Sequence, residues 1–142
     1  MISRDDAKHL LRVLKENLSP VELERILTVV SRRLGGTIKD LVEDKPSELV
    51  RAILEELRSR IIFPCMMLLE IYDYMVERFG IERIELVLGP LENNKITLDP
   101  TIIEEIRRST QEMVIFFNRA VEEIGLYNLK IEIGRNTPWW RP

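Results

Sequence analysis

The first part of the chain repeats its apolar residues with the period of an α-helix. Between Ser3 and Asn17, apolar residues recur every three or four positions, so they share one face of a predicted helix. The same spacing returns between Ser19 and Gly35, where serine is a preferred N-cap and glycine a preferred helix end. The pattern therefore predicts two amphipathic helices at the start of the chain.

Further helical segments follow. A short helical turn is predicted over 37–43, and a longer helix begins at "DKPSEL" and continues to about Ile61. Pro64 then interrupts the pattern, because a residue that precedes proline is pushed out of helical geometry. We therefore expect a corner at Phe63 and a new helix from Pro64 to Phe79.

The period of the pattern changes after Gly80. The stretches "RIELVL" and "KITL" alternate apolar and polar residues, which predicts two strands joined by the turn-forming "GPLENN". A long helix is predicted over roughly 101–124, with Asp99 as its cap and Pro100 at its start. The alternating stretch "NLKIEIG" predicts a third strand after this helix.

Together these elements predict an α+β fold class. A chain of 142 residues with 45% hydrophobic side chains is long enough to bury a core of its own, so we expect a single domain over 1–142. In it, a helical N-terminal half of four to five helices (1–80) packs with a small three-stranded sheet backed by one long helix. The strand-strand-helix-strand part covers 81–135, and an extended tail rich in proline and tryptophan covers 136–142.

Composition and charge argue against several classes of protein. A net charge of -3 does not suit a protein whose whole surface binds nucleic acid or acidic lipid. The longest apolar run, "IIFPCMMLL", is too short to span a membrane, and charges in the first residues interrupt a signal peptide. We therefore expect a cytoplasmic protein with no membrane partner. Its 32% of charged residues is typical of proteins from heat-loving organisms.

The residues that most enzymes use are scarce in this chain. All six glycines lie at expected element boundaries, so no phosphate-binding loop is predicted, and the closest stretch, "RRLGGTIK", indicates a helix end followed by a helix start. His9 is the only histidine and is expected at a half-buried or surface position rather than as a general base. The only cysteine, Cys65, has apolar neighbours, which favours an inert core thiol. We expect no catalytic residue and no cofactor, and a protein that is not an enzyme.

Three carboxylates offer one candidate for a metal site. Glu70, Asp73 and Glu77 share a face of the predicted helix, and carboxylate oxygens are ligands for a hard cation such as Mg²⁺. Solvated acidic stripes are common on helices, so an ordinary surface is favoured over an enzyme with a bound metal.

Basic residues form a second candidate surface, on the first helix. Arg4, Lys8, Arg12 and Lys15 fall within about 80° of one another at 100° per residue, beside the apolar face. These four cations suit phosphate groups, although a helix-turn-helix reading is opposed by the two carboxylates at the start of the second helix. The alternative function is therefore a small nucleic-acid-binding protein that uses this basic stripe.

Two apolar residues stand on or near the charged side of the long helix. Ile115 falls in the middle of that side and Phe116 near its edge. A helix of this length is expected to be covered by a second layer, either the N-terminal helices of the same chain or another subunit.

Both tryptophans lie in the last residues, "NTPWWRP". Prolines make this tail stiff and extended, so Trp139 and Trp140 lose little entropy when they dock. They are interpreted as a latch on this chain's own core or as an anchor, with Arg141, for another subunit or protein, because Trp and Arg dominate interface hot spots. Stacking on single-stranded bases is a third interpretation.

Taken together, these patterns predict a non-enzymatic module for protein–protein interaction or assembly that associates with itself. The expected contacts are Ile115, Phe116, Trp139, Trp140 and Arg141. The partner is expected to be a second copy of the chain or another protein, with nucleic acid as the alternative.

Overall fold

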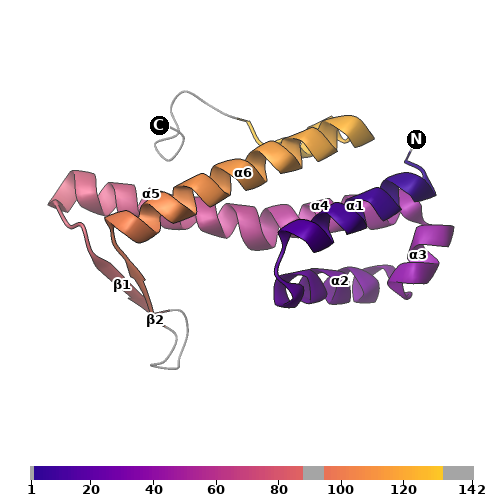
Figure 1. Cartoon of the computed structure of the whole chain (residues 1–142), viewed down its shortest axis with the longest axis horizontal. Coiled ribbons are helices and arrows are strands. Elements are labelled where there is room, and N and C mark those ends of the chain that lie inside the picture. Colours follow the sequence, from indigo (N-terminus) through magenta and orange to yellow (C-terminus); the bar gives the residue numbers. More distant parts are fainter. Residues whose placement is uncertain (1, 88–94, 133–142) are drawn as a thin grey trace. The chain divides into compact units, whose positions relative to one another are not determined.

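The computed structural model describes residues 2–87 and 95–132 of the chain (Figure 1). These residues form two compact units. The first unit contains the chain up to Ile61 together with Phe116–Ile131, and the second contains Ile62–Ile115. The chain is mostly helical with a small antiparallel sheet, so the α+β class is confirmed at this level.

The first two helices begin and end where the sequence predicts. Helix α1 covers Arg4–Asn17, and a capping box at its start joins the side chains and backbone amides of Ser3 and Asp6 in both directions. Helix α2 covers Pro20–Leu34 and ends at Gly35, whose φ of 74° lies in the left-handed region that glycine adopts without strain. Local capping chemistry therefore explains both boundaries.

Helix α4, Pro46–Leu57, is the core of the first unit. Helices α1 and α2 and the short helix α3, Ile38–Asp44, each pack on it (Figure 1). Its apolar residues occur on most of its circumference, which is typical of a helix that neighbours cover on several sides. The side chains with almost no exposed surface are Leu49, Val50, Ala52, Ile53, Leu54 and Leu57.

The predicted corner at Phe63 is wrong. A π-helical turn, Arg58–Ile62, follows α4, and helix α5, Phe63–Phe79, begins directly after it. Ile62 keeps right-handed helical angles, with φ -68° and ψ -53°. Pro64 lies in the first turn of α5, where the missing N–H costs little, and the wider π turn before it accommodates the ring.

The two predicted strands are present and pair with each other. Strand β1, Ile84–Val87, is antiparallel to β2, Lys95–Leu98, and Ile84 lies opposite Leu98. Burial alternates along β1, with Ile84 and Leu86 half-buried and their neighbours exposed, as the sequence pattern predicts. The predicted turn between the strands, 89–94, lies outside the described residues.

The predicted long helix is also present, as α6, Pro100–Ile124. Asp99 caps it, because its Oδ1 accepts a hydrogen bond from the backbone N–H of Ile102 at 2.9 Å. The part of α6 up to Ile115 belongs to the second unit and the remainder to the first.

The predicted third strand is wrong for the residues that the structure describes. The chain forms a short 3-10 helix, Tyr127–Leu129, and then reaches Ile131, which pairs with a side chain instead of a strand. The Asn118 amide donates to the Ile131 carbonyl at 2.9 Å and accepts from the Ile131 N–H at 2.8 Å. Asn118 is 7% exposed, so this buried side chain satisfies the backbone groups that a neighbouring strand would otherwise use.

We predict that Asn118→Ala lowers the free energy of unfolding by about 2–3 kcal/mol, because it leaves the buried N–H and C=O of Ile131 without partners. Chemical denaturation of the full chain measures this change. Asn128→Ala is the matched control, since Asn128 is exposed and its loss should change stability by less than about 0.5 kcal/mol. Equal effects of the two substitutions would contradict the role assigned to Asn118.

Candidate functional site

The four basic residues predicted on the first helix do not share one environment. Arg4 is bound to α3: its Nη1 lies 3.2 Å from Oε2 of Glu43, and its Nε donates to the Glu43 carbonyl at 3.1 Å. Lys8, Arg12 and Lys15 are exposed, and within the described part of the chain they form no ion pair. Three of the four cations are therefore open to a ligand.

The three carboxylates of α5 differ in the same way. Asp73 binds Arg107 of α6, with Oδ1 2.9 Å from Nη2, and both side chains are largely buried. Glu70 and Glu77 are exposed. Among the residues that the structure describes, no three His, Cys, Asp or Glu side chains are grouped to hold a metal ion. The Arg107–Asp73 pair instead joins α6 to α5 within the second unit.

Of the predicted partner-binding residues, the structure describes two. Ile115 is 52% exposed. Phe116 is half-buried and lies over α1 in the first unit, where it lines a cavity. Trp139, Trp140 and Arg141 lie outside the described residues, so the interpretation of the tail stays a prediction.

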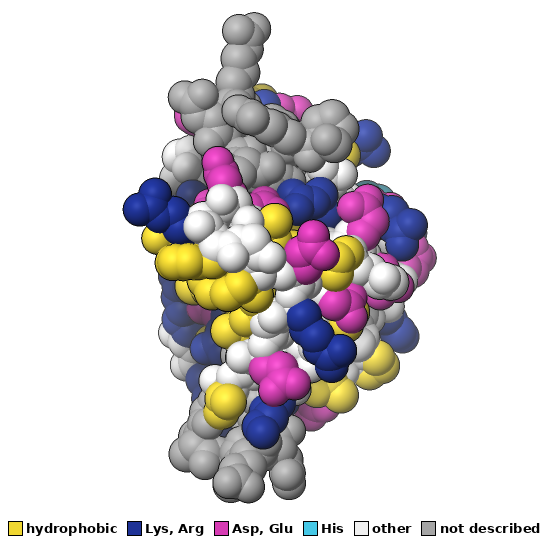
Figure 2. Space-filling model, turned by 90° about the vertical axis from the view of Figure 1, so that its left-hand side faces the viewer, with side chains coloured by type: hydrophobic (Ala, Val, Ile, Leu, Met, Phe, Trp, Pro, Cys, Tyr) yellow, Lys and Arg dark blue, Asp and Glu magenta, His cyan; other side chains and the backbone are white. Residues whose placement is uncertain are grey.

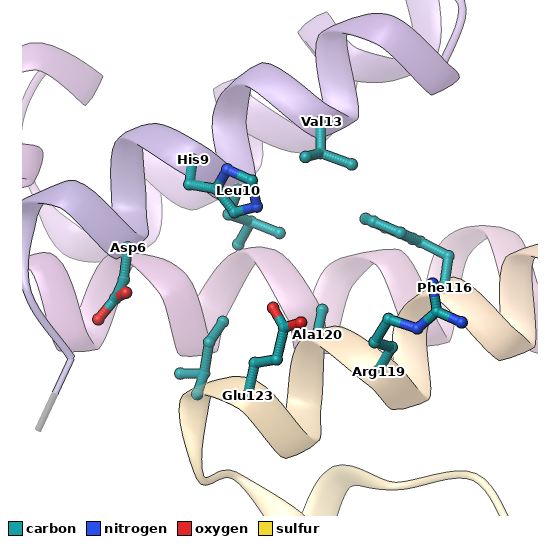
Figure 3. Close-up of a pocket in the computed structure, with 9 residues that line it drawn as sticks. Asp6, His9, Leu10, Val13, Phe116, Arg119, Ala120 and Glu123 are labelled. Carbon is teal, nitrogen blue, oxygen red and sulfur yellow. The ribbon is translucent and has the colours of Figure 1, made fainter.

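The cavity that Phe116 lines lies between α1 and the end of α6, and we call it the α1–α6 cavity (Figure 3). Its volume is about 230 Å³. The apolar part of its lining consists of Leu10, Val13, Phe116, Ala120 and Ile124, and the charged or titratable part consists of Asp6, His9, Arg119 and Glu123. Leu10 and Ala120 are buried, so the cavity has an apolar floor.

The titratable groups of this cavity come from both helices. Asp6 takes part in the capping box, and the hydrogen bonds from the backbone and side chain of Ser3 hold the pKa of its carboxyl below the ordinary value, with a smaller effect of His9. His9 is exposed, in keeping with the surface position expected for it. In Figure 3, Glu123 extends from α6 toward α1, and His9 extends from α1 toward α6.

An open apolar groove lies elsewhere on the first unit, between α2 and the neighbouring ends of α1 and α3. Its volume is about 770 Å³. Leu18, Leu23, Leu27 and Ile38 are among the residues of its surface, and Lys15 also borders it. We call it the α2–α3 groove. Most of the surface of its lining is apolar.

The largest set of exposed apolar side chains on one helix lies on α5. Phe63, Met67, Ile71 and Tyr74 fall within about 80° of one another around this helix, and we call them the α5 stripe. Met67 and Tyr74 are 57% and 58% exposed, and Tyr74 packs edge-to-face on Phe79 with ring centroids 6.1 Å apart. Figure 2, which views the molecule from the side where α5 ends, shows hydrophobic side chains at the surface between charged ones.

The opposite face of α5 is also apolar, and it is buried. Leu69 has no exposed surface, and the hydroxyl of Tyr72 donates to the carbonyl of Glu82 at 2.9 Å. Burial, and to a lesser extent the carboxylates of Glu82 and Asp99, raises the pKa of Tyr72, so this phenol stays protonated as the donor. Helix α5 therefore has one apolar face that is buried and a second, the α5 stripe, whose side chains are 37–58% exposed.

The α5 stripe does not follow from the periodicity of the sequence. The stretch "FPCMMLLEIYDYM" is apolar on nearly all sides of a helix. This composition is the sequence signal from which the stripe could have been predicted. Periodicity alone does not tell which of two apolar faces is buried, because both satisfy the same spacing.

No known protein family, characterised protein or solved structure matches this chain. No helix among the described residues is both long and apolar enough to cross a membrane. The function must therefore be inferred from the chain's own surfaces.

We predict that the Asp6 carboxyl, on the wall of the α1–α6 cavity, titrates below its ordinary pKa of 3.8 and that Ser3→Ala raises this pKa. Because the folded pKa is depressed, the capping interaction stabilises α1 above about pH 3.8 and is lost as the pH falls through the folded pKa. NMR titration of the Asp6 side chain measures this pKa in the wild type and in Ser3→Ala. Ser19→Ala, which removes the cap of α2, is the control and should leave the Asp6 pKa unchanged.

Proposed function

We propose that this chain is a non-enzymatic protein–protein interaction module that associates with itself through the α5 stripe. The observation that carries the proposal is the exposed second face of α5. A helix with two apolar faces normally has both of them covered, so the exposed stripe is a surface that gains from a partner.

The composition of the stripe supports a protein partner. Phe63, Met67, Ile71 and Tyr74 extend over about 16 Å of the helix axis. Aromatic residues and methionine are enriched at protein interfaces, where their large apolar surfaces leave water. Exposed Glu70 and Arg78 border the stripe and supply the polar rim that such interfaces have.

A second copy of the chain is the partner we propose, because two antiparallel copies of α5 can bring Met67 of one stripe opposite Tyr74 of the other. About a midpoint between Glu70 and Ile71, Met67 mirrors Tyr74 and Phe63 mirrors Arg78. Two copies of α5 packed antiparallel about a twofold axis therefore place Met67 of one copy against Tyr74 of the other, a favourable sulfur–aromatic contact. They also place Arg78 over the ring of Phe63, a cation–π pair.

The other predicted contacts remain part of the proposal. Ile115 is exposed and adds apolar surface to the second unit, and Phe116, Trp139, Trp140 and Arg141 remain proposed contributors. A protein other than a second copy would use the same surface.

We expect Met67→Glu to raise the dimer dissociation constant at least tenfold, because the substitution places a charge in an apolar contact. Light scattering or sedimentation over a range of concentrations measures the mass. Val21→Glu is the matched control, since Val21 is equally exposed at 59% but lies on α2, and it should leave the mass unchanged.

Two outcomes would overturn this proposal. The first is a wild-type chain that remains monomeric up to about 1 mM, the concentration at which even a weak association of roughly -4 kcal/mol becomes visible. The second is a dimer that persists in Met67→Glu and in Tyr74→Glu while both variants keep the native circular-dichroism spectrum.

Nucleic-acid binding is retained as the second candidate because Lys8, Arg12 and Lys15 are exposed on α1 and unpaired within the described residues. Three phosphate contacts give only modest affinity, with log K falling by about 2–3 per tenfold rise in salt.

If the basic stripe binds nucleic acid, Lys8→Glu combined with Arg12→Glu should abolish binding to a single- or double-stranded oligonucleotide. Fluorescence anisotropy at several salt concentrations measures the affinity for the oligonucleotide. Lys39→Glu with Lys45→Glu changes the net charge equally but alters α3 and its end, so this control should retain binding. Equal losses in both double variants would point to a general charge effect and against a site on α1.

A further inference from the structure

The α1–α6 cavity combines a closed apolar floor with charges of both signs at its mouth. Leu10 and Ala120 form the buried floor, and the half-buried Val13, Phe116 and Ile124 form the walls. Ala120 has the smallest side chain of this lining and lies between Arg119 and Glu123 along α6, so it leaves the space that the cavity occupies (Figure 3).

The two charged α6 residues at the mouth form no ion pair within the described residues. Arg119 and Glu123 are four residues apart, yet neither forms an ion pair with the other or with any other described residue. An arginine that precedes the glutamate is also the less favourable order for such a pair on a helix. The neighbouring Glu122, in contrast, is bound to Lys130.

A guanidinium and a carboxylate one helical turn apart select a ligand that carries both charges on a short framework. Positions i and i+4 place their Cβ atoms about 6 Å apart, so the two side chains can reach one head group from opposite sides. The guanidinium suits a carboxylate, to which it donates two parallel hydrogen bonds. The Glu123 carboxylate, with Asp6 across the cavity, suits an ammonium group.

We propose that the α1–α6 cavity binds an apolar α-amino acid, with its carboxylate on Arg119, its ammonium on Glu123 and Asp6, and its side chain on the apolar floor. A plain phosphate is disfavoured because two carboxylates border the cavity. A hydrocarbon without polar groups is disfavoured because it would strip water from the charged mouth without replacing the hydrogen bonds.

The test uses the full chain and three related probes: L-leucine, 3-methylbutylamine, which lacks the carboxylate, and 4-methylpentanoic acid, which lacks the amine. Isothermal titration or NMR should give a leucine affinity at least about tenfold higher than that of either partial analogue, because each analogue leaves one charge unmatched. Amide shifts caused by leucine should map to Phe116, Ala120 and Ile124.

Two substitutions connect each charge to one group of the ligand. Arg119→Gln should weaken leucine about tenfold or more and leave the amine unaffected, while Glu123→Gln should weaken leucine and leave the acid unaffected. Arg108→Gln and Glu112→Gln, exposed on α6 but outside the cavity lining, are the matched controls and should bind leucine as the wild type does. Ala120→Leu, which fills the cavity, should abolish binding while the folded spectrum is kept.

Several results would overturn the proposal. They are the absence of leucine binding at about 10 mM, an amine or acid that binds as tightly as leucine, and an Arg119→Gln effect equally large for leucine and amine. Amide shifts caused by leucine that map to the α2–α3 groove instead of the α1–α6 cavity would also overturn the proposal. If Ala120→Leu fails to fold, the two charge substitutions with their controls still decide the question.

Discussion

The burial of α4 is the constraint on which the rest of the first unit depends. A helix with apolar side chains on most of its circumference requires several partners, and α1, α2 and α3 each supply an amphipathic face. Ion pairs across this packing involve residues at its edge, such as Arg33 with Glu55 at 2.8 Å. Arg33 and then Arg51 lower the pKa of Glu55 through hydrogen bonds, so this carboxylate stays charged at neutral pH. Once α1 is packed on α4, its polar face is left for other contacts.

The second unit has the opposite imbalance. Helix α5 has apolar side chains on two faces, of which one is buried and the other, the α5 stripe, is partly exposed. The Arg107–Asp73 pair and the Tyr72–Glu82 hydrogen bond hold the covered face in place. An exposed apolar face costs free energy, because its side chains stay in contact with water and do not pack against protein atoms. The self-association that we propose through the α5 stripe would remove this cost without any catalytic group, which is why we favour an interaction module over an enzyme.

Pairing of charges distinguishes residues that hold the fold from residues that are open to ligands. Arg4, Asp73 and Glu122 all look like surface charges in the sequence, yet each is bound to a residue of another segment. Arg119 and Glu123 look like an ordinary pair on a helix, yet within the described part of the chain neither forms an ion pair, and both line an apolar cavity. We propose these two charges for ligand binding because no ion pair within the described residues has to be broken first.

The sequence by itself determined most of the helix boundaries and the strand pair, but not the continuous turn from α4 into α5. Caps such as Ser3 and Asp99, and a helix end such as Gly35, act on groups within four residues, so local chemistry was sufficient. Only the tertiary structure decided features that join distant segments. Asn118 replaces a third strand at Ile131, and Arg107 takes Asp73 away from the predicted acidic cluster. These contacts join residues 13 and 34 positions apart. In the same way, the elements that pack beside α5 decide which of its two apolar faces is buried. Hydrophobic periodicity specifies a face but not its partner, because burial is non-directional and any complementary surface satisfies it.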